Sequence, residues 1–262
     1  MTRRVIVSED AAQLASTVAD AFVNVVTNWL STHDGPMHIA LTGGRTGAAT
    51  LNAIGALPSQ AIDWSRIHLW WGDERWLPGG DAERNDEVAR TALLDRITIP
   101  TQNVHRVAAS DSGLSLDEAA AAYRAELESF SVNGWGHPAF GLVFLGVGPD
   151  GHIASLFPHR VGISVEDMPA IAVHDSPKPP SERVSLTRRV LNSADYVWLM
   201  LTGADKAAAL GLALAGASRD EVPAAGIKGR IETVYYVDIA AAANVPSNVT
   251  IRYAVGDRVG RD

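Results

Sequence analysis

Short runs of apolar and β-branched residues alternate with amphipathic, helix-like patterns along nearly the whole chain. An apolar run of this kind, bounded by turn residues, is typical of a buried strand. The pattern predicts strands at residues 3–8, 37–44, 66–74, 139–148, 170–175, 195–203 and 233–239. Strands that alternate with helices form βαβ units, so we predict an α/β fold whose mostly parallel sheet carries helices on both faces.

The longest helical pattern lies between the first two predicted strands. Apolar residues recur there at the spacing of one helix face: Leu14, Val18, Phe22, Val25 and Trp29. Ser8 is the predicted N-cap of this helix, because its hydroxyl can accept a hydrogen bond from a free backbone N–H. Further helices are predicted at residues 46–57, 82–96, 115–130 and 204–216.

Neither an internal repeat nor a low-complexity linker divides the chain, so we predict a single α/β domain over residues 1–240. The strongest proline-rich interruption is "DSPKPPSER" (175–183), interpreted as a loop that crosses the functional edge of the sheet. Residues 241–262 are predicted to be a C-terminal extension, which forms either a final strand or a loose tail.

Composition narrows the class of protein. With 262 residues, 47% of them hydrophobic, the chain can bury a large core. It has no cysteine, which excludes disulfides and thiolate sites and fits a reducing cytoplasm. There is no apolar run of the roughly 18 residues that a membrane helix needs, and no signal-peptide pattern. We therefore expect a soluble, cytoplasmic protein.

The net charge restricts the partners. A formal charge of -8 and a pI of about 5.4 argue against a nucleic-acid surface, which would need a basic face. An anionic substrate would need local positive charge to overcome this field. Basic residues at the ends of predicted strands are therefore the candidates for binding an anionic substrate.

Three glycine-containing segments follow predicted strands, at the edge where open parallel sheets bind ligands. In "LTGGRTG" (41–47), Gly43 and Gly44 precede Arg45 and Thr46 at a predicted helix start. Free N–H groups, a guanidinium and a hydroxyl together suit a phosphate. The alternative is a tight turn in which Thr46 merely caps the helix. The segment is neither G-x-G-x-x-G nor a Walker A loop, which disfavours a dinucleotide or ATP.

The second segment, "WWGDERWLP" (70–78), places Asp73, Glu74 and Arg75 where an apolar strand ends. Neighbouring tryptophans would lower the local dielectric constant and strengthen any electrostatic role of these charges. The alternative is a solvated charge run with an internal ion pair.

The third segment, "LGVGPDGHIASLFP" (145–158), presents His152 after a buried strand. Histidine titrates near neutral pH, as a general base requires, and Asp150 could hold the tautomer of the ring. The flanking glycines would let backbone and substrate approach closely. The alternative is a structural histidine in a glycine-rich turn.

Two further cations follow the proline-rich loop. Arg183 begins "RVSLT", and Lys206 in "LTGADKAAAL" falls in the first turn of a predicted helix. A cation there is unfavourable with the helix dipole unless an anion lies nearby. Both residues could converge on a phosphate, although either could be ordinary surface charge.

Taken together, these segments resemble the 6-phosphogluconolactonase family. The resemblance runs through the three motifs in order, continues in "DSPKPPSERVSLT" and "LTGADK", and covers roughly residues 5–240. It implies a Rossmann-like, modified doubly wound sheet, similar to that of glucosamine-6-phosphate deaminases, and neither a metal nor an organic cofactor. The implied reaction hydrolyses 6-phospho-D-glucono-1,5-lactone to 6-phospho-D-gluconate, in the oxidative pentose phosphate pathway. The expected partner is this small sugar-phosphate lactone, and the expected assembly is a monomer or small homo-oligomer.

The resemblance also implies roles for residues. His152 would activate water, with Asp150, Asp73 and Arg75 in the catalytic part of the site. Arg75, or backbone amides of "GPDGH", would stabilise the oxyanion. The substrate phosphate would be bound by Gly43, Gly44, Arg45, Thr46, Arg183 and Lys206.

The sequence is also compatible with two rival functions. A deaminase or isomerase of amino-sugar phosphates would share the fold, but that family places a glutamate five residues after the histidine, where this chain has Phe157. A non-catalytic sugar-phosphate sensor is the other rival. A sensor that regulates transcription would need a DNA-binding module, yet only one strand and one helix precede "MHIALTGG".

Overall fold

The computed structural model describes residues 2–58, 61–132 and 134–254. Within these ranges one sheet contains β1 (Thr2–Ser8), β2 (Met37–Leu41), β3 (Ile67–Trp71), β5 (Phe140–Gly146), β8 (Tyr196–Leu201), β9 (Glu232–Asp238) and β10 (Ile251–Tyr253). Their order across the sheet is β10-β1-β9-β8-β5-β2-β3, and every neighbouring pair is parallel. The predicted α/β fold is confirmed.

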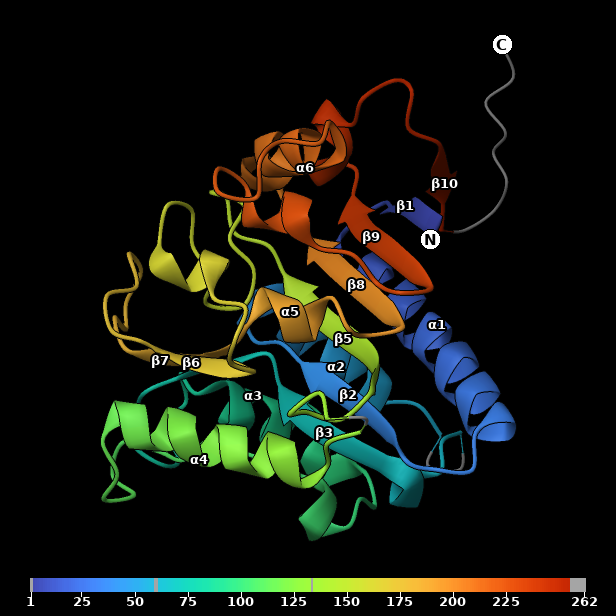
Figure 1. The fold of residues 1–262 in the computed structure, drawn as a ribbon. Helices are drawn as coiled ribbons and strands as arrows, with labels where there is room; N and C mark the ends of the chain where they lie inside the picture. Colours follow the sequence, from blue (N-terminus) through green and yellow to red (C-terminus); the bar gives the residue numbers. More distant parts are fainter. Residues whose placement is uncertain (1, 59–60, 133, 255–262) are drawn as a thin grey trace.

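Helices cover both faces of this sheet (Figure 1). They are α1 (Ala11–Thr32), α2 (Gly44–Gly55), α3 (Asn85–Ala92), α4 (Leu116–Ser129), α5 (Arg188–Leu191) and α6 (Ala207–Leu214). Side chains of β5 alternate between two cores: Leu142 and Phe144 pack with α1, α2 and α3, while Val143 and Leu145 pack with α4, α5 and α6. This alternation explains why the strand is apolar throughout. None of the described helices is long and apolar enough to cross a membrane.

The first helix begins differently from the prediction. Ser8 is the last residue of β1, where it pairs with Asp238 of β9. Asp10 is the N-cap of α1 instead, and its side chain accepts a hydrogen bond from the backbone N–H of Gln13 at 2.8 Å. The prediction of Ser8 was wrong because the strand extends to that residue.

A second, antiparallel sheet has the order β4-β7-β6, with β4 (Asp73–Arg75), β6 (Ala170–Val173) and β7 (Arg183–Leu186). The predicted strand 66–74 is therefore two strands, divided at Gly72. The N–H of Gly72 donates to the carbonyl of Leu41 in the large sheet, and its own carbonyl accepts from Leu186 N–H in the small one, both at 2.8 Å. This switch carries Asp73 and Arg75 out of the large sheet to the carboxyl ends of its strands.

The C-terminal extension contributes a strand. Ile251–Tyr253 form β10, which pairs in parallel with β1 at the sheet edge. Residues 255–262 of the predicted extension lie outside the described residues. The division of the chain at residue 240 stays a prediction.

Candidate active site

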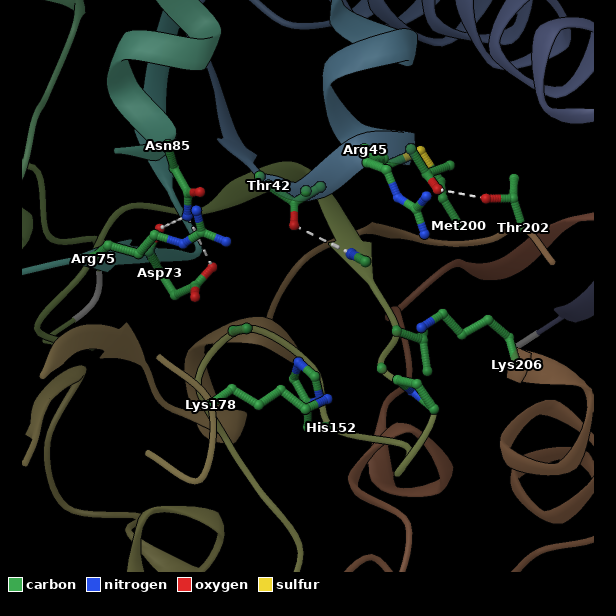
Figure 2. Close-up of a pocket in the computed structure, with 18 of the residues that line it drawn as sticks. Thr42, Arg45, Asp73, Arg75, Asn85, His152, Lys178, Met200, Thr202 and Lys206 are labelled. Atoms are coloured by element: carbon green, nitrogen blue, oxygen red, sulfur yellow. Dashed lines mark hydrogen bonds between the residues drawn. The ribbon is translucent and has the colours of Figure 1, made fainter. Parts of the chain in front are cut away.

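A cavity of about 210 Å³ opens where β2, β5 and β8 end (Figure 2). This volume is below the roughly 300 Å³ at which pockets for drug-sized ligands begin, so it suits a small metabolite. The predicted residues that line it are Gly43, Gly44, Arg45, Thr46, Asp73, Arg75, His152, Arg183 and Lys206. The remaining one, Asp150, contacts the cavity residue His152.

The turn from β2 into α2 forms one wall of the cavity. Gly44 has a φ of +76°, a left-handed conformation that favours glycine. The side chain of Asn85 occupies the place where a Cβ on Gly43 would lie. The Thr46 hydroxyl bonds the Thr202 hydroxyl at 2.9 Å, and the N-cap of α2 carries no side-chain cap, so the capping alternative is not observed. The unpaired N–H groups of the first helical turn therefore border the cavity.

His152 and Asp150 form a close pair in the turn after β5. Nδ1 of the ring lies 2.5 Å from Oδ1 of Asp150. Burial opposes ionisation of Asp150, but the hydrogen bonds and positive charges of His152 and Lys178 outweigh it and lower the pKa of the carboxyl. An ionised carboxylate only accepts hydrogen bonds, so Nδ1 carries a proton, and the lone pair of a neutral ring is then on Nε2.

The imidazole of His152 packs closely against Phe157 and Gly148. The ring of Phe157 stacks on it, with centroids 4.6 Å apart and planes 29° apart. A Cβ on Gly148 would collide with Nδ1 of the imidazole and with the Asp150 carboxylate. Glycine at 148 therefore allows the close approach that brings the ring to the cavity.

Asp73 and Arg75 both reach the cavity because they are alternate residues of β4. Asp73 accepts a hydrogen bond from the Ser155 hydroxyl at 2.7 Å, and Asn85 donates to the backbone carbonyl of Asp73 at 2.8 Å. Nη1 of Arg75 donates to the carbonyl of Glu83 at 2.7 Å. The two side chains lie on the opposite side of the cavity from Arg45 and Lys206 (Figure 2).

Glu74, between them, is buried and anchors the start of α3. Its carboxylate accepts hydrogen bonds from the backbone N–H groups of Arg75, Asn85 and Asp86 at 2.7–2.8 Å. Nη2 of Arg84 lies 3.7 Å away. Burial, together with the negative charge of Asp86, raises the pKa of Glu74 to about 8. The alternative of a solvated charge run is wrong, because Asp73 and Glu74 are only 7% and 1% exposed.

Arg183 lines the cavity, but its donors are directed at the protein. Nε donates to the carbonyl of Pro180 at 3.0 Å, and Nη2 donates to those of Lys178 and Pro179 at 3.2 and 3.1 Å. Nη1 lies 3.4 Å from the Ser155 hydroxyl and 3.9 Å from Asp73. Each nitrogen of the predicted phosphate ligand thus already has a protein partner.

Lys206 lies at the N-terminal end of α6, as its sequence position indicated. Its ammonium is 3.1 Å from the carboxylate of Asp205, and it borders the cavity near Thr202 and Arg45. Two cations and the N-terminus of α2 thus gather on one side of the cavity (Figure 2). Such a cluster can bind a phosphate group.

Lys178 also lines the cavity but was not among the predicted site residues, although it lies in the proline-rich loop predicted to cross this edge. Its Nζ is 3.1 Å from Oδ1 of Asp150 and 3.0 Å from Nδ1 of His152. Figure 2 shows its side chain alongside the imidazole. A lysine inside a loop over the functional edge is the signal that could have identified it.

The structure brings no metal-binding cluster together in the described residues. Over residues 2–58, 61–132 and 134–254, no three His, Asp or Glu side chains are placed to hold a metal ion.

Comparison with known proteins identifies the family. A sequence model of the family described as glucosamine-6-phosphate isomerases/6-phosphogluconolactonase matches residues 9–236. The chain belongs to this family. The resemblance inferred from the sequence motifs is thereby confirmed.

Individual family members are similar over most of the chain. The 6-phosphogluconolactonase of Streptomyces coelicolor is 43% identical over 253 residues, which are 95% of this chain and 97% of that protein. The 6-phosphogluconolactonase of Mycobacterium tuberculosis is 46% identical over 211 residues, or 80% of this chain and 85% of the other.

Solved structures of the family share the fold. The crystal structure of 6-phosphogluconolactonase from Thermotoga maritima superposes with a TM-score of 0.79 at 28% identity, covering 90% of this chain and 100% of that one. A monomeric glucosamine-6-phosphate deaminase has a TM-score of 0.73 at 16% identity, covering 93% and 100%, so its likeness concerns the fold alone.

Proposed function

We propose that this protein hydrolyses 6-phospho-D-glucono-1,5-lactone to 6-phospho-D-gluconate, with His152 as the general base. The observation that carries the proposal is the Asp150–His152 pair at the cavity, because its 2.5 Å contact supports a proton on Nδ1 and Nε2 as the base. The relatives named 6-phosphogluconolactonase support the choice of substrate. The reaction belongs to the oxidative pentose phosphate pathway.

The phosphate of the substrate binds on the side formed by α2 and α6. The first turn of α2 provides free N–H groups, and Arg45 and Lys206 provide positive charge. The lactone ring then extends toward His152, on the adjacent side of the cavity (Figure 2). Arg183 contributes through the loop that it holds, because its nitrogens already contact protein oxygens.

The reaction starts when Nε2 of His152 takes a proton from water while the water oxygen attacks C1 of the lactone. The tetrahedral oxyanion collapses, the bond between C1 and the ring oxygen breaks, and imidazolium returns the proton to that oxygen. The product is a carboxylic acid that ionises, so each turnover releases one proton to the medium. General base catalysis contributes about 10²- to 10⁴-fold to such a step.

Arg75 is the favoured donor to the oxyanion. The rival donors in the "GPDGH" turn include the N–H groups of Gly148 and Gly151, which donate to the carbonyls of His152 and Gly148, both at 2.9 Å. Arg75 uses Nη1 for the carbonyl of Glu83, which leaves further N–H groups of its guanidinium for the cavity. A cation there stabilises the negative charge that develops on the carbonyl oxygen.

Phe157 separates this proposal from a deaminase. The deaminase pattern places a glutamate five residues after the histidine as its partner in ring opening, and this chain has Phe157 there, stacked on the imidazole. An apolar neighbour disfavours the charged imidazolium and suits a neutral base. We therefore expect no ammonia from glucosamine 6-phosphate under conditions in which the lactone is hydrolysed rapidly.

The test measures proton release from freshly generated 6-phosphogluconolactone, corrected for spontaneous hydrolysis. His152→Ala should lower kcat by about 10²-fold or more with little change in KM, because a base acts in the transition state. His174→Ala is the matched control, since His174 is exposed and pairs with Asp117 far from the cavity lining. Near-wild-type kcat in folded His152→Ala, or ammonia release at a comparable rate, would overturn the proposal.

A further inference from the structure

The ammonium group of Lys178 contacts the imidazole of His152, the proposed base. Its ammonium nitrogen lies 3.0 Å from Nδ1 of His152 and 3.1 Å from Oδ1 of Asp150, so the three groups form a closed triangle. An ammonium has only donors, and Nδ1 can be either a donor or an acceptor. With a neutral imidazole, the triangle therefore admits two different proton arrangements.

In the first arrangement, Nδ1–H donates to Asp150, and Lys178 pairs with the same carboxylate. Nε2 then has a free lone pair and can accept a proton. In the second arrangement, Lys178 donates to a bare Nδ1, and Nε2 carries the proton and cannot act as a base. The 2.5 Å contact between Nδ1 and Oδ1 excludes the second, because two lone pairs at that distance would repel each other.

Lys178 is held in this place by backbone contacts of its own loop. Arg183 donates from Nη2 to the carbonyls of Lys178 and Pro179, and from Nε to the carbonyl of Pro180. The hydroxyl of Ser176 also donates to the carbonyl of Lys178 at 2.9 Å. Because Arg183 is only 5% exposed, the loop is tied to the protein interior, and its lysine is directed at the pair.

We propose that Lys178 is a positioning residue for His152: paired with Asp150, its charge keeps the imidazole neutral, with the proton on Nδ1 and Nε2 free. The proposal rests on His152 being the base in the function proposed above. A carboxylate alone would favour imidazolium, which cannot accept a further proton. A cation beside the ring opposes that charging, so the base stays competent at lower pH.

Other charged groups face the same cavity and also contribute to the electrostatic potential at His152. They are Arg45, Asp73, Arg75, Arg183 and Lys206. The guanidinium carbon of Arg183 lies 5.7 Å from the centroid of the Phe157 ring, which also stacks on the imidazole. Lys178 and Asp150 are the two charged groups within hydrogen-bond distance of the described ring, so a substitution at Lys178 changes the nearest cation alone.

The experiment compares wild type with Lys178→Met, which keeps the length of the side chain and removes the charge. We expect the acid limb of the kcat/KM profile to move up by roughly one pH unit, the scale of a screened contact between unit charges. At pH values on that limb, Lys178→Met should therefore lose activity up to about tenfold, with less change on the alkaline side. Lys178→Arg, which retains the charge, should restore the wild-type limb, and Lys228→Met is the matched control at an exposed lysine.

A second measurement needs no substrate. The ¹⁵N chemical shifts of the His152 ring report which nitrogen carries the proton and at what pH the second proton binds. We expect Nδ1–H in the wild type, and charging of the ring at higher pH in Lys178→Met. An unchanged acid limb together with unchanged ring titration in Lys178→Met would overturn the proposal, as would an Nε2–H ring in the wild type. Absence of lactone hydrolysis by the wild type would instead refute the proposed function, while the ring titration would still test Lys178.

Discussion

Acid should destabilise this protein through a cluster of buried and half-buried histidines beside α4. His38 is 8% exposed, and Nε1 of Trp70 donates to its Nδ1 at 3.0 Å. The rings of His38 and His68 lie 4.8 Å apart, and His68 in turn bonds His105 at 2.8 Å. Burial, and then the positive charges that His68 and His105 would carry, lower the pKa of His38 from 6.5 to about 3.

The direction of the stability change follows from the number of protons that each state binds. The folded state holds His38 neutral, whereas the unfolded chain binds a proton at about its ordinary pKa, so the unfolded state binds more protons in acid. The contribution is complete above pH 6.5 and is lost as the pH falls toward 3. At pH 5, 1.5 units below the ordinary value, His38 alone removes about 2 kcal/mol of stability, at about 1.4 kcal/mol per pH unit. The pKa values of His68 and His105 are also lowered by burial, so these histidines add to the loss.

Urea unfolding at pH 7.5 and pH 5.0 measures this loss in wild type and in His38→Gln. Glutamine can still accept the N–H of Trp70 but does not titrate, so the acid-induced loss should be about 2 kcal/mol smaller in the variant. His174→Gln, at an exposed histidine, is the control and should lose as much as the wild type. Equal losses in wild type and His38→Gln would show that His38 is not held neutral and would refute the reasoning.

Two further predictions concern the cavity. Lys206→Ala should raise KM for the phosphorylated lactone by roughly 10- to 150-fold with little change in kcat, since a lost charged hydrogen bond costs about 1.5–3 kcal/mol. Steady-state kinetics on phosphorylated and unphosphorylated gluconolactone checks this, and an undiminished preference for phosphate would contradict it. Gly148→Ala should lower kcat by about 10²-fold at nearly unchanged Tm, because its Cβ would displace the imidazole of His152. Gly35→Ala, where a Cβ meets nothing within 4 Å, is the control, and equal kcat values for the two variants would count against this prediction.

The sequence was sufficient to predict the parallel sheet, because strands buried on both faces leave continuous apolar runs. It did not predict that the run at 66–74 changes sheets at Gly72, since that change depends on hydrogen bonds to Leu41 and Leu186, which are distant in the chain. The same reason applies to the site. The motifs around residues 43–46, 73–75 and 152 supplied most of the cavity, whereas Lys178 reaches it only because Arg183 fixes its loop.

The switch at Gly72 means that two sheets of different kind share one cavity. The side proposed to bind phosphate follows β2 and β8 of the large sheet, while Asp73, Arg75 and the Lys178 loop belong to the small sheet or its connections. Under the proposed function, the large sheet thus presents both the phosphate-binding residues and the base His152, which follows β5, while the small sheet adds Asp73, Arg75 and the Lys178 loop around the sugar ring. Changes confined to the small sheet would then alter the surroundings of the sugar ring while leaving the proposed phosphate-binding side and the base in place.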